Sequence, residues 1–95
     1  MAYSFSARAD RDLLEIYRHG SRAFGEAQAE RYLASLHTTF ALLAGRPHIN
    51  RERKSFSPPV RLHPSPPHII AYRQQGADIL IIRILHTRQN WHNHL

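Results

Sequence analysis

The stretch Ile79-Leu80-Ile81-Ile82-Arg83-Ile84-Leu85-His86-Thr87-Arg88-Gln89-Asn90 decides the fold of this chain. Its first half is a run of isoleucine and leucine, which is typical of a strand buried on both faces. One cation, Arg83, stands inside that run, and a buried charge is costly without a partner. Arg83 is therefore expected to form an ion pair, to reach the rim of the sheet or to face a partner molecule.

The length of the chain, 95 residues, suits a single domain with a modest core, spanning residues 1–95. Cysteine is absent, which excludes a disulfide framework and a cysteine-based zinc site. No apolar run approaches the roughly 18 residues that a membrane-spanning helix needs. The first residues, Met1 to Phe5, lack the basic and apolar regions of a secretory signal. We expect a cytoplasmic protein that does not associate with membranes.

The net charge of +6 is confined to the second half of the chain. Residues 1–45 hold five arginines and five acids, whereas residues 46–95 hold seven arginines and Lys54 against only Glu52 and Asp78. Such asymmetry is typical of a protein with an anionic partner, either nucleic acid or an acidic protein segment. The alternative is a basic domain whose charge has no partner.

A short strand and a helix are expected at the start of the chain. Tyr3 and Phe5 alternate with small residues, as in a strand, and Ser6 is placed to cap the helix that follows. Apolar side chains then recur at helical spacing on one face: Ala9, Leu13, Ile16 and Tyr17. This helix is expected to end between Gly20 and Gly25.

A second helix is expected from about Glu26 to Gly45, where the glycine and the following Pro47 both favour termination. Its apolar stripe is continuous: Ala29, Leu33, Leu36, Phe40 and Leu43. Because the connection between the two helices is short, they should pack as a helical hairpin with both stripes in the core.

The second half of the chain predicts strands. All six prolines lie in residues 46–67, so we expect a loop there with one short strand at Val60 to His63, irregular or near an edge. The segments His68 to Gln74 and Asp78 to His86 are predicted as the central hairpin of the sheet, closed by a type II′ turn at Gly76. The expected register places two pairs opposite each other beyond Gln75 and Asp78: Tyr72 with Ile81, and Ile70 with Arg83.

The expected fold class is therefore α+β. It consists of a small antiparallel sheet in the order β-α-α-β-β-β, with the helical hairpin packed on one face.

Taken in order, these segments resemble the ParE toxins of the RelE/ParE superfamily, the toxic halves of bacterial type II toxin–antitoxin pairs. The resemblance is carried by Phe5 to Leu13 with its Ala-x-x-Asp-Leu, Ile16-Tyr17, Phe24-Gly25, Ala29 to Tyr32, Ile70 to Arg73, and Ile82 to Gln89. The most specific part is Arg-Ile-Leu-His-x-Arg-Gln in the last segment. Three places depart from the family pattern: Pro58-Pro59-Val60-Arg61 replaces a Gly-Leu-Arg approach, the segment Leu62 to Pro67 is unusually rich in proline, and Ala71 stands where a bulky aromatic is common.

The resemblance implies a protein that poisons DNA gyrase by binding and that is neutralised by a cognate antitoxin. It implies no cofactor and no sequence-specific DNA binding by the toxin alone. The expected target-binding residues are Arg61, Arg73, Arg83, His86, Arg88 and Trp91. The expected antitoxin-binding residues are Leu13, Tyr17, Tyr72 and Arg83. For Trp91 the alternative is that the tail folds back on an open end of the sheet.

Two other functions stay open at this point. RelE proteins share the fold and cut messenger RNA in the ribosomal A site, and a fold alone does not choose between the activities. RNA cleavage needs cations on the phosphate and groups that move protons, for which the candidates are Lys54, Arg61, Arg83 and His86. The third hypothesis is a non-toxic interaction module. The pair His92 and His94 lacks the spacing of a zinc site, so no metal is expected.

Overall fold

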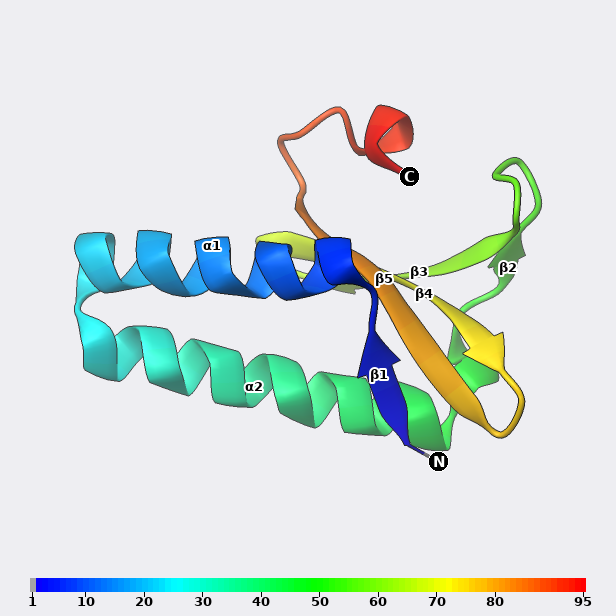
Figure 1. The fold of residues 1–95 in the computed structure, drawn as a ribbon, viewed down its shortest axis with the longest axis horizontal. Helices are drawn as coiled ribbons and strands as arrows, with labels where there is room; N and C mark the ends of the chain where they lie inside the picture. Colours follow the sequence, from blue (N-terminus) through cyan, green and yellow to red (C-terminus); the bar gives the residue numbers. More distant parts are fainter. Residues whose placement is uncertain (1) are drawn as a thin grey trace.

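The computed structural model describes residues 2–95, which form a five-stranded sheet and two long helices (Figure 1). The elements in chain order are β1 (Tyr3–Phe5), α1 (Ala7–Phe24), α2 (Glu26–Gly45), η1 (Pro47–Ile49), β2 (Glu52–Arg53), β3 (Val60–Ser65), β4 (His68–Gln75), β5 (Asp78–His86) and η2 (Trp91–His94), where η marks a 3-10 helix. The strand order is β1-β5-β4-β3-β2, with the β4–β5 hairpin inside the sheet as predicted. The predicted α+β class is confirmed.

A serine cap and a glycine shape the helical hairpin. The Ser6 hydroxyl accepts a hydrogen bond from the Ala9 amide at 3.0 Å, which satisfies one of the free donors at the start of α1. Gly25 has a φ of 89°, a conformation that other residues rarely adopt, and it separates α1 from α2 without a loop. The bounds of both helices agree with the prediction. Neither helix in the described part of the chain has the length and apolarity that crossing a bilayer requires.

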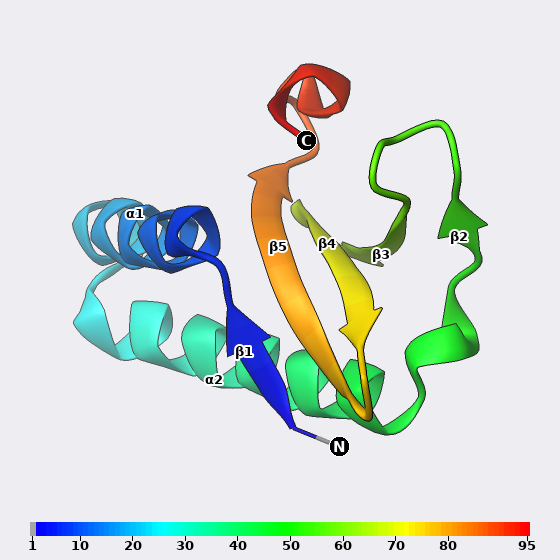
Figure 2. The same ribbon diagram turned by 45° about the vertical axis from the view of Figure 1, so that its right-hand side comes forward.

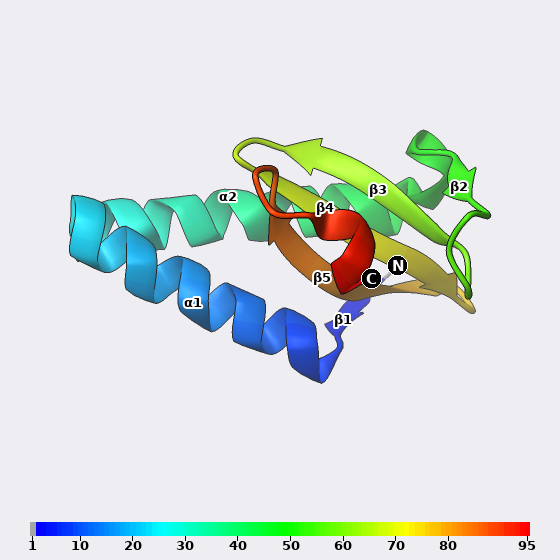
Figure 3. The same cartoon turned by 90° about the horizontal axis from the view of Figure 1, so that it is seen from above.

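The core lies between α2 and one face of the sheet, while α1 runs along the β5 side (Figures 2 and 3). Its buried members are Ala9 from α1, Leu36, Phe40, Leu43 and Ala44 from α2, Ile70 and Tyr72 from β4, and Ile79, Ile81 and Ile84 from β5. The C-terminal tail, drawn in red, lies over the opposite face of the sheet, where Figures 1 and 3 agree on its place. The sheet is thus covered by α2 on one side, and the chain's own tail packs on part of the other side, near Leu62 and Ile69.

The sheet is mixed and not wholly antiparallel as predicted, because β1 runs parallel to β5. Parallel pairing requires a long crossover connection, and the helical hairpin and the strands β2 to β4 supply it. The sequence pattern did not predict β2, which pairs only with Val60 and Arg61 of β3. Beyond Arg61 the proline-rich end of β3 forms an outer edge, where Pro64 is tolerated although it has no amide hydrogen to donate.

The predicted register of the central hairpin is correct near the turn and wrong past its middle. Gly76 has a φ of 66°, as the turn requires. Two predicted pairs are confirmed: Gln75 with Asp78 and Tyr72 with Ile81. The predicted pairing of Ile70 with Arg83 is wrong, because Ile70 lies opposite Ile84.

A β-bulge in β5 accounts for the difference. Ile82 is an extra residue between the pair Tyr72–Ile81 and the pair Ala71–Arg83. Its carbonyl accepts a hydrogen bond from the Ser6 hydroxyl at 2.7 Å, so the start of α1 holds the bulge in place. Beyond the bulge the alternation of the strand is reversed, and Arg83 stands on the face opposite to α2.

Candidate functional site

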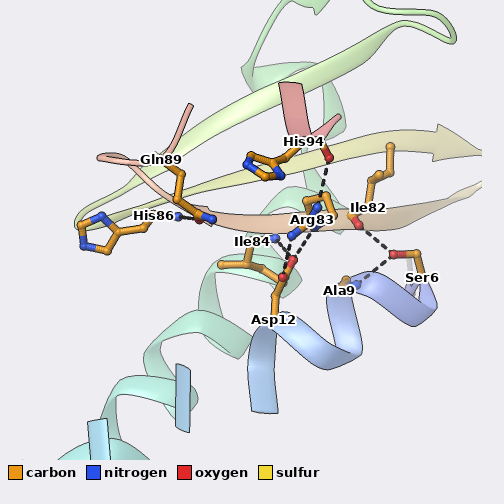
Figure 4. A network of polar contacts seen from close by, with 9 residues as sticks. All are labelled: Ser6, Ala9, Asp12, Ile82, Arg83, Ile84, His86, Gln89 and His94. Carbon is orange, nitrogen blue, oxygen red and sulfur yellow. Dashed lines mark hydrogen bonds and ion pairs between the residues drawn. The ribbon is translucent and has the colours of Figure 1, made fainter. Parts of the chain in front are cut away.

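Arg83 of β5 is buried and forms an ion pair with Asp12 of α1 (Figure 4). Arg83 Nε donates to Asp12 Oδ2 at 2.8 Å and Arg83 Nη2 donates to Oδ1 at 2.9 Å, a bidentate arrangement. Arg83 Nη1 donates to the His94 carbonyl of the tail at 3.0 Å. Only 9% of the residue is exposed. Of the three possibilities expected for Arg83, the structure shows the ion pair. A contact of Arg83 with a target or an antitoxin stays a prediction.

The same carboxylate completes the edge of the sheet. The strand β1 ends opposite Ile81, and beyond it α1 takes the place of a neighbouring strand. Asp12 Oδ2 accepts a hydrogen bond from the Ile84 amide at 2.9 Å, as a carbonyl of an added strand would. Asp12 therefore satisfies one backbone donor and one buried cation. No pattern in the sequence links Asp12 to β5, so sequence reasoning did not find this role.

A groove of about 830 Å³ opens between α1, α2 and the neighbouring ends of β4 and β5. Its apolar lining comes from Ile16, Phe24, Ala29, Tyr32, Pro67 and Ile84. Phe24 is 64% exposed, which is unusual for a large aromatic side chain and places an unburied ring in this groove. The volume lies in the range of ligand and peptide sites in proteins.

Two histidines and a tyrosine form the sheet side of this groove. His68 and His86 are paired across β4 and β5 with ring centroids 5.5 Å apart, and the Tyr32 hydroxyl lies 2.6 Å from His68 Nδ1. Burial is the main cause that lowers the pKa of His68 from 6.5 to about 4; the charges of His86 and His19 contribute to the decrease, while Asp12 opposes it. Burial raises the pKa of Tyr32. At neutral pH the His68–Tyr32 pair is therefore uncharged.

Of the polar residues that line this groove, His86 was predicted as a target-binding or ribonuclease residue, whereas no functional role was predicted for His68, Tyr32 or His19. The helical stripe around Tyr32 resembled ordinary core, and its contact with His68 depends on the tertiary fold. Within the described residues, no three histidine or carboxylate side chains are arranged to hold a metal ion.

The predicted target-binding residues are spread over different surfaces. Arg61 lies opposite Tyr72 on the α2 side of the sheet, where its Nη1 donates to the Asn50 carbonyl at 2.6 Å. Arg73 is adjacent to Tyr72 in β4 and therefore stands on the other face. His86 lines the groove, and Arg88 is exposed in the tail.

The tail folds back over the sheet, as the alternative for Trp91 anticipated. Trp91 is half-buried and lines a shallow pocket of about 210 Å³ together with Leu62 and Ile69. Its ring centroid lies 6.4 Å from that of Phe56. A role of Trp91 in target contact stays a prediction. The side chain of the neighbouring His92 lies outside the described residues.

The predicted antitoxin-binding residues also separate. Leu13 and Tyr17 are half-buried on α1. Tyr72 has no exposed surface. Its hydroxyl donates a hydrogen bond to the Pro47 carbonyl and accepts one from Asn50 Nδ2, each at 3.0 Å. In this structure Tyr72 is a core residue that anchors η1 to the sheet, and it has no surface for a partner.

Comparison with known proteins gives consistent matches over nearly the whole chain. Residues 3–91 match the family described as ParE toxin of type II toxin-antitoxin system, parDE. Toxin ParE1 of Caulobacter vibrioides is 31% identical over 93 residues, covering 98% of this chain and 96% of the relative. Toxin ParE of Escherichia coli is 31% identical over 90 residues, covering 94% and 87%. A solved chain described as the chromosomal ParDE TA system from P. aeruginosa has a TM-score of 0.76 at 25% identity, covering 90% of this chain and 95% of that one.

Replacing Asp12 by alanine should destabilise the protein strongly, because Arg83 would keep its buried charge without a counter-ion. We expect Asp12→Ala to lower the free energy of unfolding by about 3–5 kcal/mol, measured by urea denaturation followed by circular dichroism. The matched control is Glu15→Ala on the same helix, which breaks an ion pair with Arg18 whose side chains are 71% and 53% exposed. That change should cost less than about 1 kcal/mol. Equal stability of the two variants would contradict a structural role for the Asp12–Arg83 pair.

The low pKa of His68 makes stability depend on pH. Because the ring binds its proton more weakly in the folded state, the unfolded state holds more protons between pH 6.5 and about 4, and stability falls as the pH drops through this window. Between about pH 7.5 and about pH 5 we expect the wild type to lose about 1–2 kcal/mol more than His68→Gln, after a discount for partial exposure. Urea unfolding at both pH values measures the difference. Parallel losses in the two proteins would contradict the prediction.

Proposed function

Because this chain belongs to the ParE family of toxins from type II toxin–antitoxin systems, we propose that it inhibits DNA gyrase by binding to it in the cytoplasm. We further propose that a cognate antitoxin neutralises it. The observation that carries the proposal is the match to ParE toxins over residues 3–91, at 31% identity to two of them. Inhibition by binding needs a complementary surface and no reacting groups.

The positions of the four ribonuclease candidates support binding over RNA cleavage. His86 lies opposite His68, whereas Arg61 lies opposite Tyr72, four residues further along β4. That separation is roughly 13 Å along the strand alone. Arg83 is engaged by Asp12, and Lys54 follows the edge strand β2. Cleavage by the 2′-hydroxyl needs an acid, a base and a cation around a single phosphate.

The groove between the helices and the sheet is the site that we assign to the antitoxin. Its lining is mostly apolar, and at neutral pH the pair His68–Tyr32 adds no charge to it. A partly disordered segment that folds on binding can lay an apolar helix face into a groove of this kind. The exposed ring of Phe24 offers an anchor for such a helix.

An assay of gyrase supercoiling and DNA cleavage with the purified protein tests the proposed target. We expect loss of supercoiling together with trapped, cleaved DNA, and no cleavage in a parallel ribosome-dependent messenger RNA assay. Messenger cleavage with gyrase unaffected would replace this proposal with a ribonuclease of the RelE type. No effect in either assay, with normal growth on induced expression without antitoxin, would favour a non-toxic interaction module.

Phe24→Ser tests the antitoxin site without disturbing the core, because the side chain is already 64% exposed. We expect about tenfold weaker binding of the antitoxin encoded beside this gene, measured by isothermal titration calorimetry, with an unchanged melting temperature. The matched control is Leu14→Ser, which removes a 48% exposed apolar residue of the same helix outside the groove. Equal affinities of the two variants would place the antitoxin elsewhere.

A further inference from the structure

We propose that the sheet face opposite α2, together with the edge at β2, binds the phosphate backbone of duplex DNA without reading its sequence. This goes beyond the proposed function, because the contact requires neither gyrase nor antitoxin. The cations that carry it are Arg51, Arg53, Lys54 and Arg73.

Two of these cations lie on the same face in neighbouring rows. Arg53 pairs with Val60 of β3, and the next residue of β3, Arg61, pairs with Tyr72, which precedes Arg73 in β4. Tyr72 points into the core beside α2, so alternation turns Arg73 to the opposite face. Arg53 lines the same shallow pocket as Trp91, which places it on that face as well. Two strand spacings separate the two arginines, roughly 10 Å.

The charges on this surface are not neutralised by the protein. Within residues 2–95, the side chains of Arg51, Arg53, Lys54 and Arg73 have neither an ion-pair partner nor a side-chain hydrogen bond. The acid nearest in sequence, Glu52, lies opposite Arg61, in the row that faces α2. Arg51 and Lys54 are exposed, and Arg53 and Arg73 are half-buried. Excess positive charge held in this way attracts a polyanion.

The arrangement favours nucleic acid over an acidic protein segment. Duplex DNA carries one charge for about every 1.7 Å of its axis, so cations spread over roughly 10 Å meet phosphates in any register. An acidic peptide has no such regular spacing of charges, so its carboxylates would have to match the positions of these cations one by one. Three of the four cations are arginines, whose planar guanidinium suits phosphate. The four cations stand on or beside the strands β2 and β4 and not on a helix that could enter the major groove, which fits backbone contact without base reading.

Fluorescence anisotropy with a labelled duplex of about 20 base pairs tests the proposal, because each contacted phosphate adds about 0.9 to the slope of log affinity against log salt. Contacts from all four cations predict a slope of about −3 to −4, and affinity roughly 100-fold weaker at about 200 mM than at about 50 mM NaCl. The double variant Arg53→Gln/Arg73→Gln should make the slope shallower by about 2. The control Arg8→Gln/Arg11→Gln removes the same charge from exposed positions of α1 and should leave the slope unchanged.

No binding at the lower salt would overturn the proposal, as would equal weakening in the two double variants. A labelled poly-glutamate peptide, run beside the duplex, covers the other class of partner. If it binds with the same dependence on Arg53 and Arg73 while the duplex does not, the face belongs to an acidic protein segment and the proposal is wrong. Circular dichroism verifies that both variants are folded. Neither gyrase nor antitoxin is in this assay, so its failure is distinguishable from failure of the proposed function.

Discussion

The carboxylate of Asp12 joins the helical layer of this protein to its sheet. It accepts two hydrogen bonds from the Arg83 guanidinium and one from the Ile84 amide. The helix α1 buries only Ala9 completely, and Leu13 and Ile16 pack against the core in part, so these polar contacts add to a modest apolar interface. The Ser6 hydroxyl makes the neighbouring attachment to the bulge at Ile82. The bulge turns Arg83 to the face opposite α2, from which its guanidinium reaches both Asp12 and the tail. Helix, strand and tail thus meet at one buried charge.

Local signals in the sequence account for most of the fold, and distant contacts account for what they missed. Gly25 and Gly45 mark the ends of the helices, and Gly76 marks the turn. The bulge has no local signal, because the apolar run continues through Ile82 without a break. The contact that holds it comes from Ser6, which is 76 residues away in the chain. The register prediction was therefore wrong beyond Ile82, where a contact with a distant residue and not the local sequence determines the pairing.

The candidate surfaces were visible in the sequence only as composition. The excess of cations in the second half was apparent, but the face that carries Arg53 and Arg73 depends on the register of β2, a strand too short to leave a pattern. The groove is even harder to predict from the sequence, because Tyr32 lies in α2 and His68 lies in β4. In space the groove borders α1 and α2, whereas the cationic face lies on the far side of the sheet. An apolar partner and an anionic one can therefore bind without competing.

The pairing of the first strand with the last imposes an order on the assembly of this protein during synthesis. Asp12 and Arg83 are 71 residues apart in the chain, and β1 has no strand partner until β5 exists. At roughly 5–20 residues per second, a ribosome exposes the helical hairpin several seconds before it completes β5. Through that interval the apolar stripes lack their sheet, and the groove lacks the wall formed by His68 and His86. The groove, whose walls come from both halves of the chain, therefore forms only when translation is nearly complete.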